Sequence, residues 1–360
     1  MEFNPRRLSI ARSRRLLNQK GFAERVGVAP HTISRCESGM TTPTTENVEQ
    51  FARALGFPVA FFYGPDLDEP SAELVSFRSQ KAMTAAIRDA ALSAGAIGFL
   101  VSDWVEERFD LPLSLLPDLH LYEAEDAART LRQEWGLGEK PLSNMVHLLE
   151  SRGVRVLSLA ENSTKVNAFS LWRGGKAYVF LNTMKSAESS RYDAAHELGH
   201  LVLHQDGKTT GRLAEDQANR FASAFLMPRA DVLAVLPRVH YLEQIVQAKK
   251  RWKVSVAALN YRLHKLGITS DWKYRDLCIQ ISTNKFNVNE PHSIEREKSV
   301  VWQKVMKTLW AERTTQKDIA NDLNLPESEV NTLIFGVLHS GVNARPDGKQ
   351  PLTLVKHLGV

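Results

Sequence analysis

Apolar residues recur at helical spacing through most of this 360-residue chain. In the first 66 residues, short amphipathic segments alternate with turn signals, and this pattern predicts helices at 5–17, 19–26, 30–37 and 45–55. A linker is expected near 65–70. A longer helical segment at 81–109 carries so many small residues that we expect it to pack closely against a neighbour. Residues 118–150, 189–266 and 293–338 are also expected to be mainly helical.

Segments typical of strands occur at 154–159, 168–172 and 176–181, and Gly174-Gly175 joins the last two in the manner of a hairpin. A further short strand is expected at 277–281. The pattern therefore predicts an α+β fold that is mostly helical and contains a small antiparallel sheet. The expected parts are a five-helix N-terminal domain at 1–66, a linking helical segment at 67–115, a central domain at 116–272 and a mixed, mainly helical region at 273–360.

The composition excludes several classes of protein. The two cysteines, Cys36 and Cys278, lie far apart and are too few for a disulfide framework or a cysteine-ligated metal. No apolar stretch approaches the ~20 residues of a membrane span, and the basic N-terminus lacks the apolar core of a signal peptide. We therefore expect a cytoplasmic protein with no membrane partner.

Basic residues are concentrated at one end of the chain. Residues 1–40 hold eight Lys or Arg and three Asp or Glu, and they account for the whole net charge of +5. This asymmetry suits a polyanionic partner at the N-terminal end only.

Residues 17–39 have the spacing of two short helices packed across a turn at Gly27. The second helix would lie in the major groove of double-stranded DNA, and a side chain at the start of the first would reach a backbone phosphate. The candidate DNA-contacting residues are Gln19, Pro30, His31, Thr32, Ser34 and Arg35. Because DNA-binding domains of this type usually engage paired half-sites, we expect a homodimer.

Residues 6–64 resemble the Cro- and lambda-repressor-like family, often called the XRE family. Lys20-Gly21 departs from the family pattern, because two good helix formers are usual at that point. The resemblance implies a transcription regulator that binds operator DNA. It rests on the Gln19 position, Ala23, Gly27-Val28, Thr32-Ile33-Ser34-Arg35, Glu37, Gly39 and Ala54-Leu55-Gly56.

Histidines at helical spacing indicate a metal site in the middle of the chain. His196 and His200 are four residues apart, so both imidazoles lie on one face of a helix and can reach one ion. Glu197 neighbours that face and can hold the metal-bound water. A catalytic zinc of this type needs a third protein ligand. His204 is unsuitable, because eight residues of helix place it about 12 Å from His196.

The third ligand is expected on a later helix at about 212–226. Glu215 borders the apolar face of that helix while Asp216 points nearly opposite, so Glu215 is the better candidate. Asn219, one turn further, could hydrogen-bond a ligating histidine and fix its orientation. Tyr192 and His204 are candidate helpers for an oxyanion, and the sequence assigns neither.

These segments resemble the ImmA/IrrE family of zinc metallopeptidases. The family pattern joins an H-E-x-x-H helix to a later E-x-x-A-N-x-F-A helix that ends in Leu-Met-Pro, and both occur here, the second between Glu215 and Pro228. The similarity extends to NAFSLW at 167–172 and FLNTMKS at 180–186. The resemblance implies a zinc-dependent endopeptidase that binds Zn²⁺ through His196, His200 and Glu215, with Glu197 as the general base.

The same resemblance implies a protein substrate. An XRE-type repressor, an antitoxin or the chain itself would be cut, in a stress, mobile-element or toxin-antitoxin setting. An extended substrate is expected to add to the strand at 176–181 by strand pairing.

Two alternatives stay open. Beside a DNA-binding regulator with an active peptidase, the protein could be a non-catalytic transcription factor whose peptidase-like domain senses a metal or ligand. It could also be a peptidase whose N-terminal domain docks onto a repressor instead of DNA. Residues 314–333 repeat a helix-turn-helix spacing without basic charge, so we expect a packing module or a protein-binding surface there. The helical segment at 81–150 is a candidate shield for the metal site.

Overall fold

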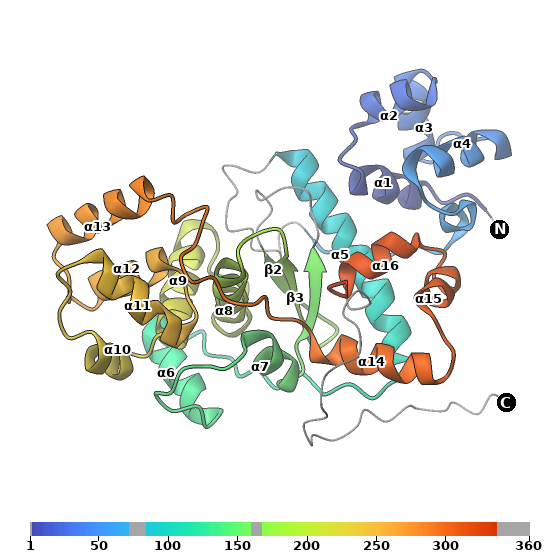
Figure 1. Ribbon diagram of the computed structural model, residues 1–360. Helices are drawn as coiled ribbons and strands as arrows, with labels where there is room; N and C mark the ends of the chain where they lie inside the picture. Colours follow the sequence, from blue (N-terminus) through green and yellow to red (C-terminus); the bar gives the residue numbers. More distant parts are fainter. Residues whose placement is uncertain (1, 72–83, 160–167, 337–360) are drawn as a thin grey trace.

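The computed structural model describes residues 2–71, 84–159 and 168–336, and its fold is α+β and mostly helical, as predicted (Figure 1). The helices before the sheet are α1 (Pro5–Arg14), α2 (Gln19–Val26), α3 (Pro30–Glu37), α4 (Thr45–Leu55), the 3-10 helix η1 (Val59–Tyr63), α5 (Ala85–Glu106), α6 (Ala124–Glu134) and α7 (Met145–Ser151). The strands are β1 (Arg155–Leu159), β2 (Phe169–Arg173) and β3 (Lys176–Asn182). The helices after the sheet are α8 (Ala187–Leu203), α9 (Gly211–Leu226), α10 (Arg229–Val235), α11 (Leu242–Trp252), α12 (Val256–Lys265), α13 (Asp271–Thr283), α14 (Val300–Ala311), α15 (Gln316–Asp322) and α16 (Glu327–Leu333).

The N-terminal helices α1 to α4 and η1 form the predicted helix-turn-helix bundle. Asn18 caps α2 by accepting a hydrogen bond from the amide of Gly21, at 2.7 Å. Gly27 ends α2 in the left-handed conformation, with φ at 67°, and this lets the chain turn into α3. Phe22, Ile33 and Phe51 are fully buried between the helices, so the predicted apolar spacing does form the core.

The sheet has the strand order β1-β3-β2, with β1 parallel and β2 antiparallel to β3. The predicted antiparallel pairing is therefore correct for β2 and β3, whose hairpin turns at Gly174 and Gly175 with φ of 55° and 75°. It is wrong for β1, because the chain leaves β1 and re-enters the sheet at its far edge. β3 is paired on both sides, so the prediction that an extended substrate could add to it is also wrong. Among the described strands, β1 and β2 form the edges.

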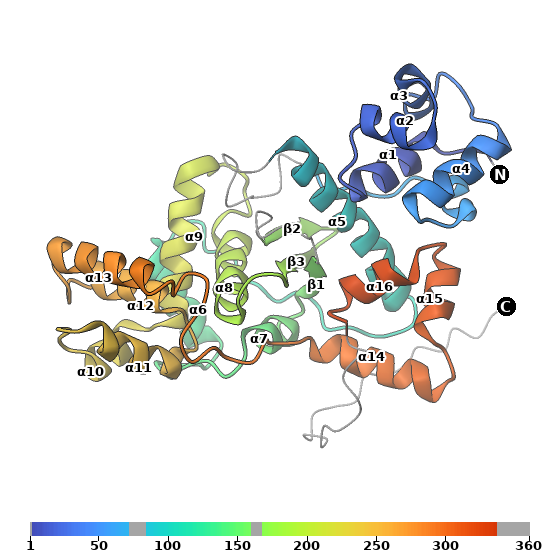
Figure 2. The same cartoon turned by 45° about the horizontal axis from the view of Figure 1, so that its top comes forward.

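The sheet is covered on both faces, by α5 on one side and α8 on the other (Figures 1 and 2). Tyr178 and Phe180 of β3 face α5, whereas Val179 and Leu181 belong to the core around α8. A Cβ added at Gly98 of α5 would lie 2.6 Å from a ring carbon of Phe180. The small residues of α5 thus allow the close packing that the sequence predicted.

Among the described residues, α5 is the one helix with the length and composition of a membrane span. The expectation that no segment of the chain is long and apolar enough for such a span is therefore wrong for α5. Its most apolar 18-residue window is 61% buried inside the protein. The apolar character of α5 is therefore explained by its packing on the sheet. Because α5 lies on the face opposite α8, it does not cover the helix that carries His196 and His200.

The segment at 277–281, expected as a strand, lies instead within helix α13. The hydroxyl of Ser270 caps this helix by accepting a hydrogen bond from the amide of Lys273, at 3.2 Å. Leu277 and Ile281 are buried one turn apart, while Ile279 between them is exposed. The alternation of apolar residues suggested a strand, but the four-residue spacing determines which side chains are buried.

Helices α14 to α16 share an apolar core with the N-terminal bundle and α5, as the packing-module hypothesis predicts. Helix α14 also contacts α7, and α16 also contacts β1. Glu329 of α16 is buried and accepts hydrogen bonds from Arg14 Nε at 2.8 Å and from Arg15. The indole of Trp104 on α5 donates to Asp322 at 3.2 Å. The C-terminal helices are thereby tied to the first helix of the chain. Residues 337–360 lie outside the described part of the structure.

An extended segment at 290–299 joins α13 to α14 and runs along α8. The amide of Ile294 donates to Glu188 of α8 at 2.9 Å. Glu297 accepts from Arg191 of α8 and also caps α7, where it accepts from the amide of Met145 at 2.8 Å. This segment therefore holds the first half of α8 in place.

The end of this segment is attached to α7 through Glu150, a buried carboxyl group that accepts a hydrogen bond from Ser299. The titration of Glu150 tests this attachment. Burial raises the pKa of Glu150 to about 7, although hydrogen bonds from Ser299 and from the amides of Val300 and Val301 act in the opposite direction. Because the folded pKa exceeds the ordinary value of 4.5, the group's contribution to stability is full below about pH 4.5 and is lost as the pH rises through about 7.

In the wild type, the free energy of unfolding should fall by up to about 3 kcal/mol as the pH rises between these values, and we expect Glu150→Gln to remove this fall. Urea denaturation at several pH values measures it. Glu312→Gln, at an exposed carboxyl group, should keep the wild-type dependence. Identical curves for Glu150→Gln and wild type would contradict the assignment.

Candidate functional site

Helix α8 carries both candidate histidines and is buried along most of its length. The hydroxyl of Ser186 caps the helix by accepting from the amide of Ser189, at 3.1 Å. His196 is fully buried and His200 is 6% exposed. Their rings face the same side of α8, as the four-residue spacing predicted, and their Nε2 atoms lie 3.1 Å apart.

Helix α9 approaches α8 closely at Gly199, the residue before His200. A Cβ at Gly199 would lie 3.2 Å from the Cα of Ala218 and 3.1 Å from the ring of Phe221. The absence of a side chain at Gly199 lets the two backbones come this near. The close approach brings Glu215, near the start of α9, to the two histidines.

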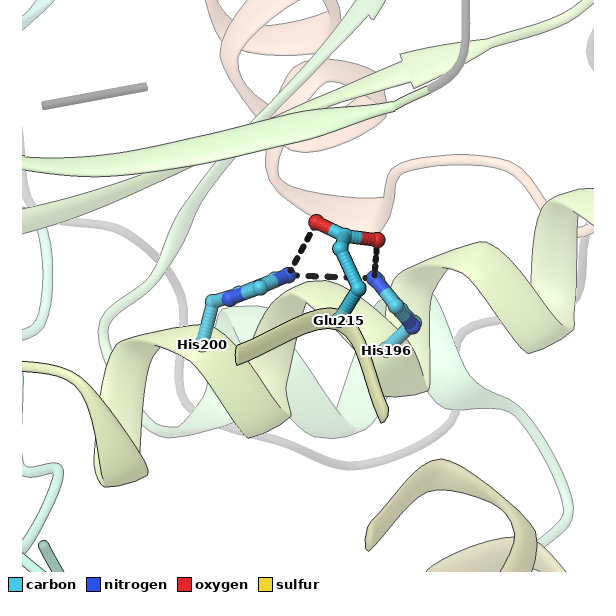
Figure 3. Close-up of side chains that lie close together, drawn as sticks. All are labelled: His196, His200 and Glu215. Carbon is cyan, nitrogen blue, oxygen red and sulfur yellow. Dashed lines mark hydrogen bonds and ion pairs between the residues drawn. The ribbon is translucent and has the colours of Figure 1, made fainter. Parts of the chain in front are cut away.

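Three ligand atoms converge on one point between the helices, as Figure 3 shows. The Glu215 carboxylate oxygens lie 3.4 Å from His196 Nε2 and 3.3 Å from His200 Nε2. In a tetrahedral zinc site with bonds of about 2.0–2.1 Å, ligand atoms are separated by about 3.3 Å. The observed separations fit such a site, and two imidazoles with one carboxylate are a donor set that zinc accepts.

The charge of Glu215 also suits a ligand. Burial by itself would raise the pKa of this carboxyl group, but polar contacts with His196 and His200 outweigh burial and lower the pKa to about 2. Glu215 is therefore a carboxylate at neutral pH. Its Oε2 atom is buried and makes no hydrogen bond, as suits an atom aimed at an ion. The neighbouring Asp216 is exposed and does not join the group.

Glu197 is buried beside the site and has a partner that the sequence analysis missed. The hydroxyl of Ser170, in edge strand β2, lies 2.7 Å from Glu197 Oε2 and donates to it. Ser170 is 4% exposed and Glu197 is 1% exposed. The two-residue period of β2 could have shown that Ser170 faces inward. That it meets Glu197 depends on how α8 crosses the sheet.

His204 and Asn219 take places different from those considered from the sequence. His204 Nδ1 lies 2.9 Å from His200 Nδ1, on the side of that ring away from His196, and His204 Nε2 lies 2.9 Å from Gln217 Oε1. Burial lowers the pKa of His204 below its ordinary value. The Asn219 amide donates to the backbone oxygen of Glu215 at 2.8 Å. The expectation that Asn219 orients a ligating histidine is therefore corrected, since it supports the helix turn that holds Glu215.

A cavity of about 1080 Å³ extends along the first turns of α8, before His196. Its walls come from α8, α9, α12 and the segment after α13, and include Tyr192, Asp216, Tyr261 and Val288. Most of the lining side chains are polar. The Tyr192 hydroxyl donates to the Asn219 backbone oxygen at 3.0 Å, which joins α8 to α9 at the end of the cavity nearest the histidines.

The outer face of α3 carries the candidate DNA-contacting residues. Pro30, His31, Ser34 and Arg35 are exposed, and Thr32 is half-buried. Side chains that contact DNA must be accessible at the surface, and these four exposed residues are.

Gln19 is held inside the N-terminal domain. Its side-chain amide donates to Glu37 at 2.7 Å, and Glu37 also accepts from Arg12 at 2.6 Å. The network joins α1, α2 and α3, so Gln19 has a structural partner in addition to any contact with phosphate. Its role in DNA binding stays a prediction.

Two protein-family models match separate parts of the chain. Residues 6–60 match the family model described as a helix-turn-helix domain, and residues 149–264 match a peptidase family model described as an IrrE N-terminal-like domain. No curated protein matches the chain. The second match spans the sheet, both histidines and Glu215. The two family models confirm the resemblances seen in the sequence.

Proposed function

We propose that this protein is a DNA-binding regulator that carries an active zinc-dependent endopeptidase. The observation that carries the proposal is the convergence of His196, His200 and Glu215 on one point beside the buried carboxylate of Glu197. The helix-turn-helix domain supports the DNA-binding part. The match to a peptidase family supports the catalytic part.

His196, His200 and Glu215 would hold the zinc. When bound, zinc supplies a Lewis acid that polarises a peptide carbonyl and lowers the pKa of water. Glu197 takes the proton of the attacking water and later gives it to the leaving amine, as a general base and then a general acid. The hydrogen bond from Ser170 keeps the Glu197 carboxylate in one orientation during both transfers. Burial of Glu197 excludes competing bulk water from the carboxylate.

A protein substrate suits the surroundings of the site. The cavity before His196 is large enough for several residues of an extended chain, and β2 offers an edge for strand pairing beside Glu197. We propose a repressor-type or antitoxin-type protein, or a second copy of this chain, as the substrate. A stress, mobile-element or toxin-antitoxin response is the corresponding setting.

DNA binding is assigned to the outer face of α3, in a homodimer that spans two half-sites. Arg35, His31 and Ser34 would contact base edges or phosphates. The sheet separates α3 from the metal centre, since α5 packs on α1 and α8 lies on the other face. DNA and a protein substrate could therefore bind to the same molecule in the cytoplasm.

Metal content tests the proposed zinc site. Purified protein should hold about one zinc per chain, and His196→Ala or Glu215→Ala should reduce this strongly, because each removes one of three ligands. Elemental analysis measures it. Asp216→Ala is the matched control, because it removes an exposed carboxylate next to Glu215 and should keep the zinc. Folded wild type that takes up no added zinc would refute the metal site.

Substitution of Glu197 tests the proposed proton transfer. Glu197→Gln should retain zinc and lose at least 100-fold in peptidase kcat, because general acid–base catalysis contributes about 10²–10⁴-fold. Ser170→Ala should lower kcat by about tenfold or more with little change in KM, because it removes a hydrogen bond to a charged group. Cleavage of a peptide library, followed by kinetics on a peptide that is cut, measures both.

Ser158→Ala is the control for the serine variant. Ser158 is buried in β1 of the same sheet and bonds the Thr183 hydroxyl at 3.1 Å, so the change alters the sheet away from Glu197. If Glu197→Gln regulates its target genes as wild type does and no peptide is cut by either protein, the non-catalytic alternative is correct.

Substitution of Arg35 tests the proposed DNA contact. Arg35→Ala should weaken binding to a duplex selected from a random library by about tenfold or more and reduce the salt dependence of binding if Arg35 touches a phosphate. Fluorescence anisotropy at several salt concentrations measures both. Arg88→Ala, which removes an exposed arginine paired with Asp89 on α5, should bind as wild type does. Salt-independent or absent binding would favour docking onto a protein instead.

A further inference from the structure

We propose that His204 and Gln217 are positioning residues that keep His200 in the tautomer able to bind zinc. The inference rests on the proposed zinc site and adds two residues to it. Neither can be a ligand in the described geometry, because His204 meets the far side of the His200 ring and Gln217 meets only His204. The three side chains, from His200 through His204 to Gln217, form a chain of hydrogen bonds that starts at the metal centre.

The first link follows from the two nitrogens of His200. Nε2 faces the site, 3.1 Å from His196 Nε2 and 3.3 Å from Glu215 Oε1. A nitrogen that binds a metal uses its lone pair, so the proton of neutral His200 must be on Nδ1. Nδ1 lies 2.9 Å from His204 Nδ1 and would donate to it.

The second link continues in the same direction. An imidazole that accepts at Nδ1 carries its proton on Nε2, and Nε2 of His204 lies 2.9 Å from Gln217 Oε1. An amide oxygen only accepts hydrogen bonds. Each of the two hydrogen bonds then has one donor and one acceptor, and the series ends at the Gln217 amide oxygen, which has no proton to donate.

The reverse direction would prevent metal binding. If the Gln217 amide presented its NH₂ group to His204, the His204 proton would move to Nδ1 and His200 would have to accept there. His200 would then carry its proton on Nε2, in the direction of the zinc. The orientation of Gln217 therefore selects the tautomer, and α9 supplies both this residue and the ligand Glu215.

The experiment is zinc affinity of the full-length metal-free protein, measured by competition with a chromophoric chelator. His204→Leu should weaken zinc binding about 10- to 100-fold, the range found when partners of metal ligands are removed. Gln217→Leu should weaken it less. The double variant should be no worse than His204→Leu alone, since the residues act in series. His204→Gln retains an acceptor and should recover most of the affinity.

His240→Leu is the matched control, because it makes the same change at an exposed histidine outside the site, and it should bind zinc as wild type does. Thermal unfolding of the metal-free variants identifies any that do not fold, and if His204→Leu is one of them, the loss of affinity expected in Gln217→Leu carries the test. Wild-type affinity in both His204→Leu and Gln217→Leu would overturn this inference and leave the zinc site intact. Failure of wild type itself to bind zinc would overturn the proposed function, and this inference with it.

Discussion

Alternate residues of β3 enter two different hydrophobic cores, and the arrangement of the molecule depends on this. Tyr178 and Phe180 belong to the core that includes α5 and the N-terminal helices, whereas Val179 and Leu181 belong to the core that includes α8 and α9. A strand buried on both faces can move toward neither side without opening a cavity, and such cavities are costly. The sheet therefore fixes α8 relative to α5. Through β2 it also brings Ser170 to Glu197.

The tail of the chain is attached to both sides of this sheet. Glu329 binds Arg14 and Arg15 in the N-terminal bundle, while Glu297 and the backbone near it bind α7 and α8. A buried carboxylate between two guanidinium groups is strongly destabilising if one partner is lost. The C-terminal region is thus an integral part of the structure, and it contacts both the N-terminal bundle and α8.

These ion pairs also change the meaning of the basic N-terminus. Arg12, Arg14 and Arg15 are engaged by Glu37 and Glu329 inside the protein, whereas Lys20, Arg25 and Arg35 are exposed. Only part of the charge excess counted along the sequence is therefore presented to a polyanion. A charge count cannot separate the two sets, because the partner of Arg14 lies more than 300 residues away in the chain.

Residue spacing alone was enough to predict the features set by local periodicity. These are the helix bounds at Gln19–Val26 and Pro30–Glu37, the hairpin at Gly174-Gly175, and the placement of His196 and His200 on one face. The spacing also favoured Glu215 over Asp216 as the carboxylate that faces the two histidines, because the apolar face of α9 restricts which side chain can turn inward. Contacts between distant segments set the parallel pairing of β1, the helical state of 277–281, and the partners of Ser170, His204 and Asn219. Those features depend on how elements distant in sequence cross, and residue spacing carries no information about a crossing.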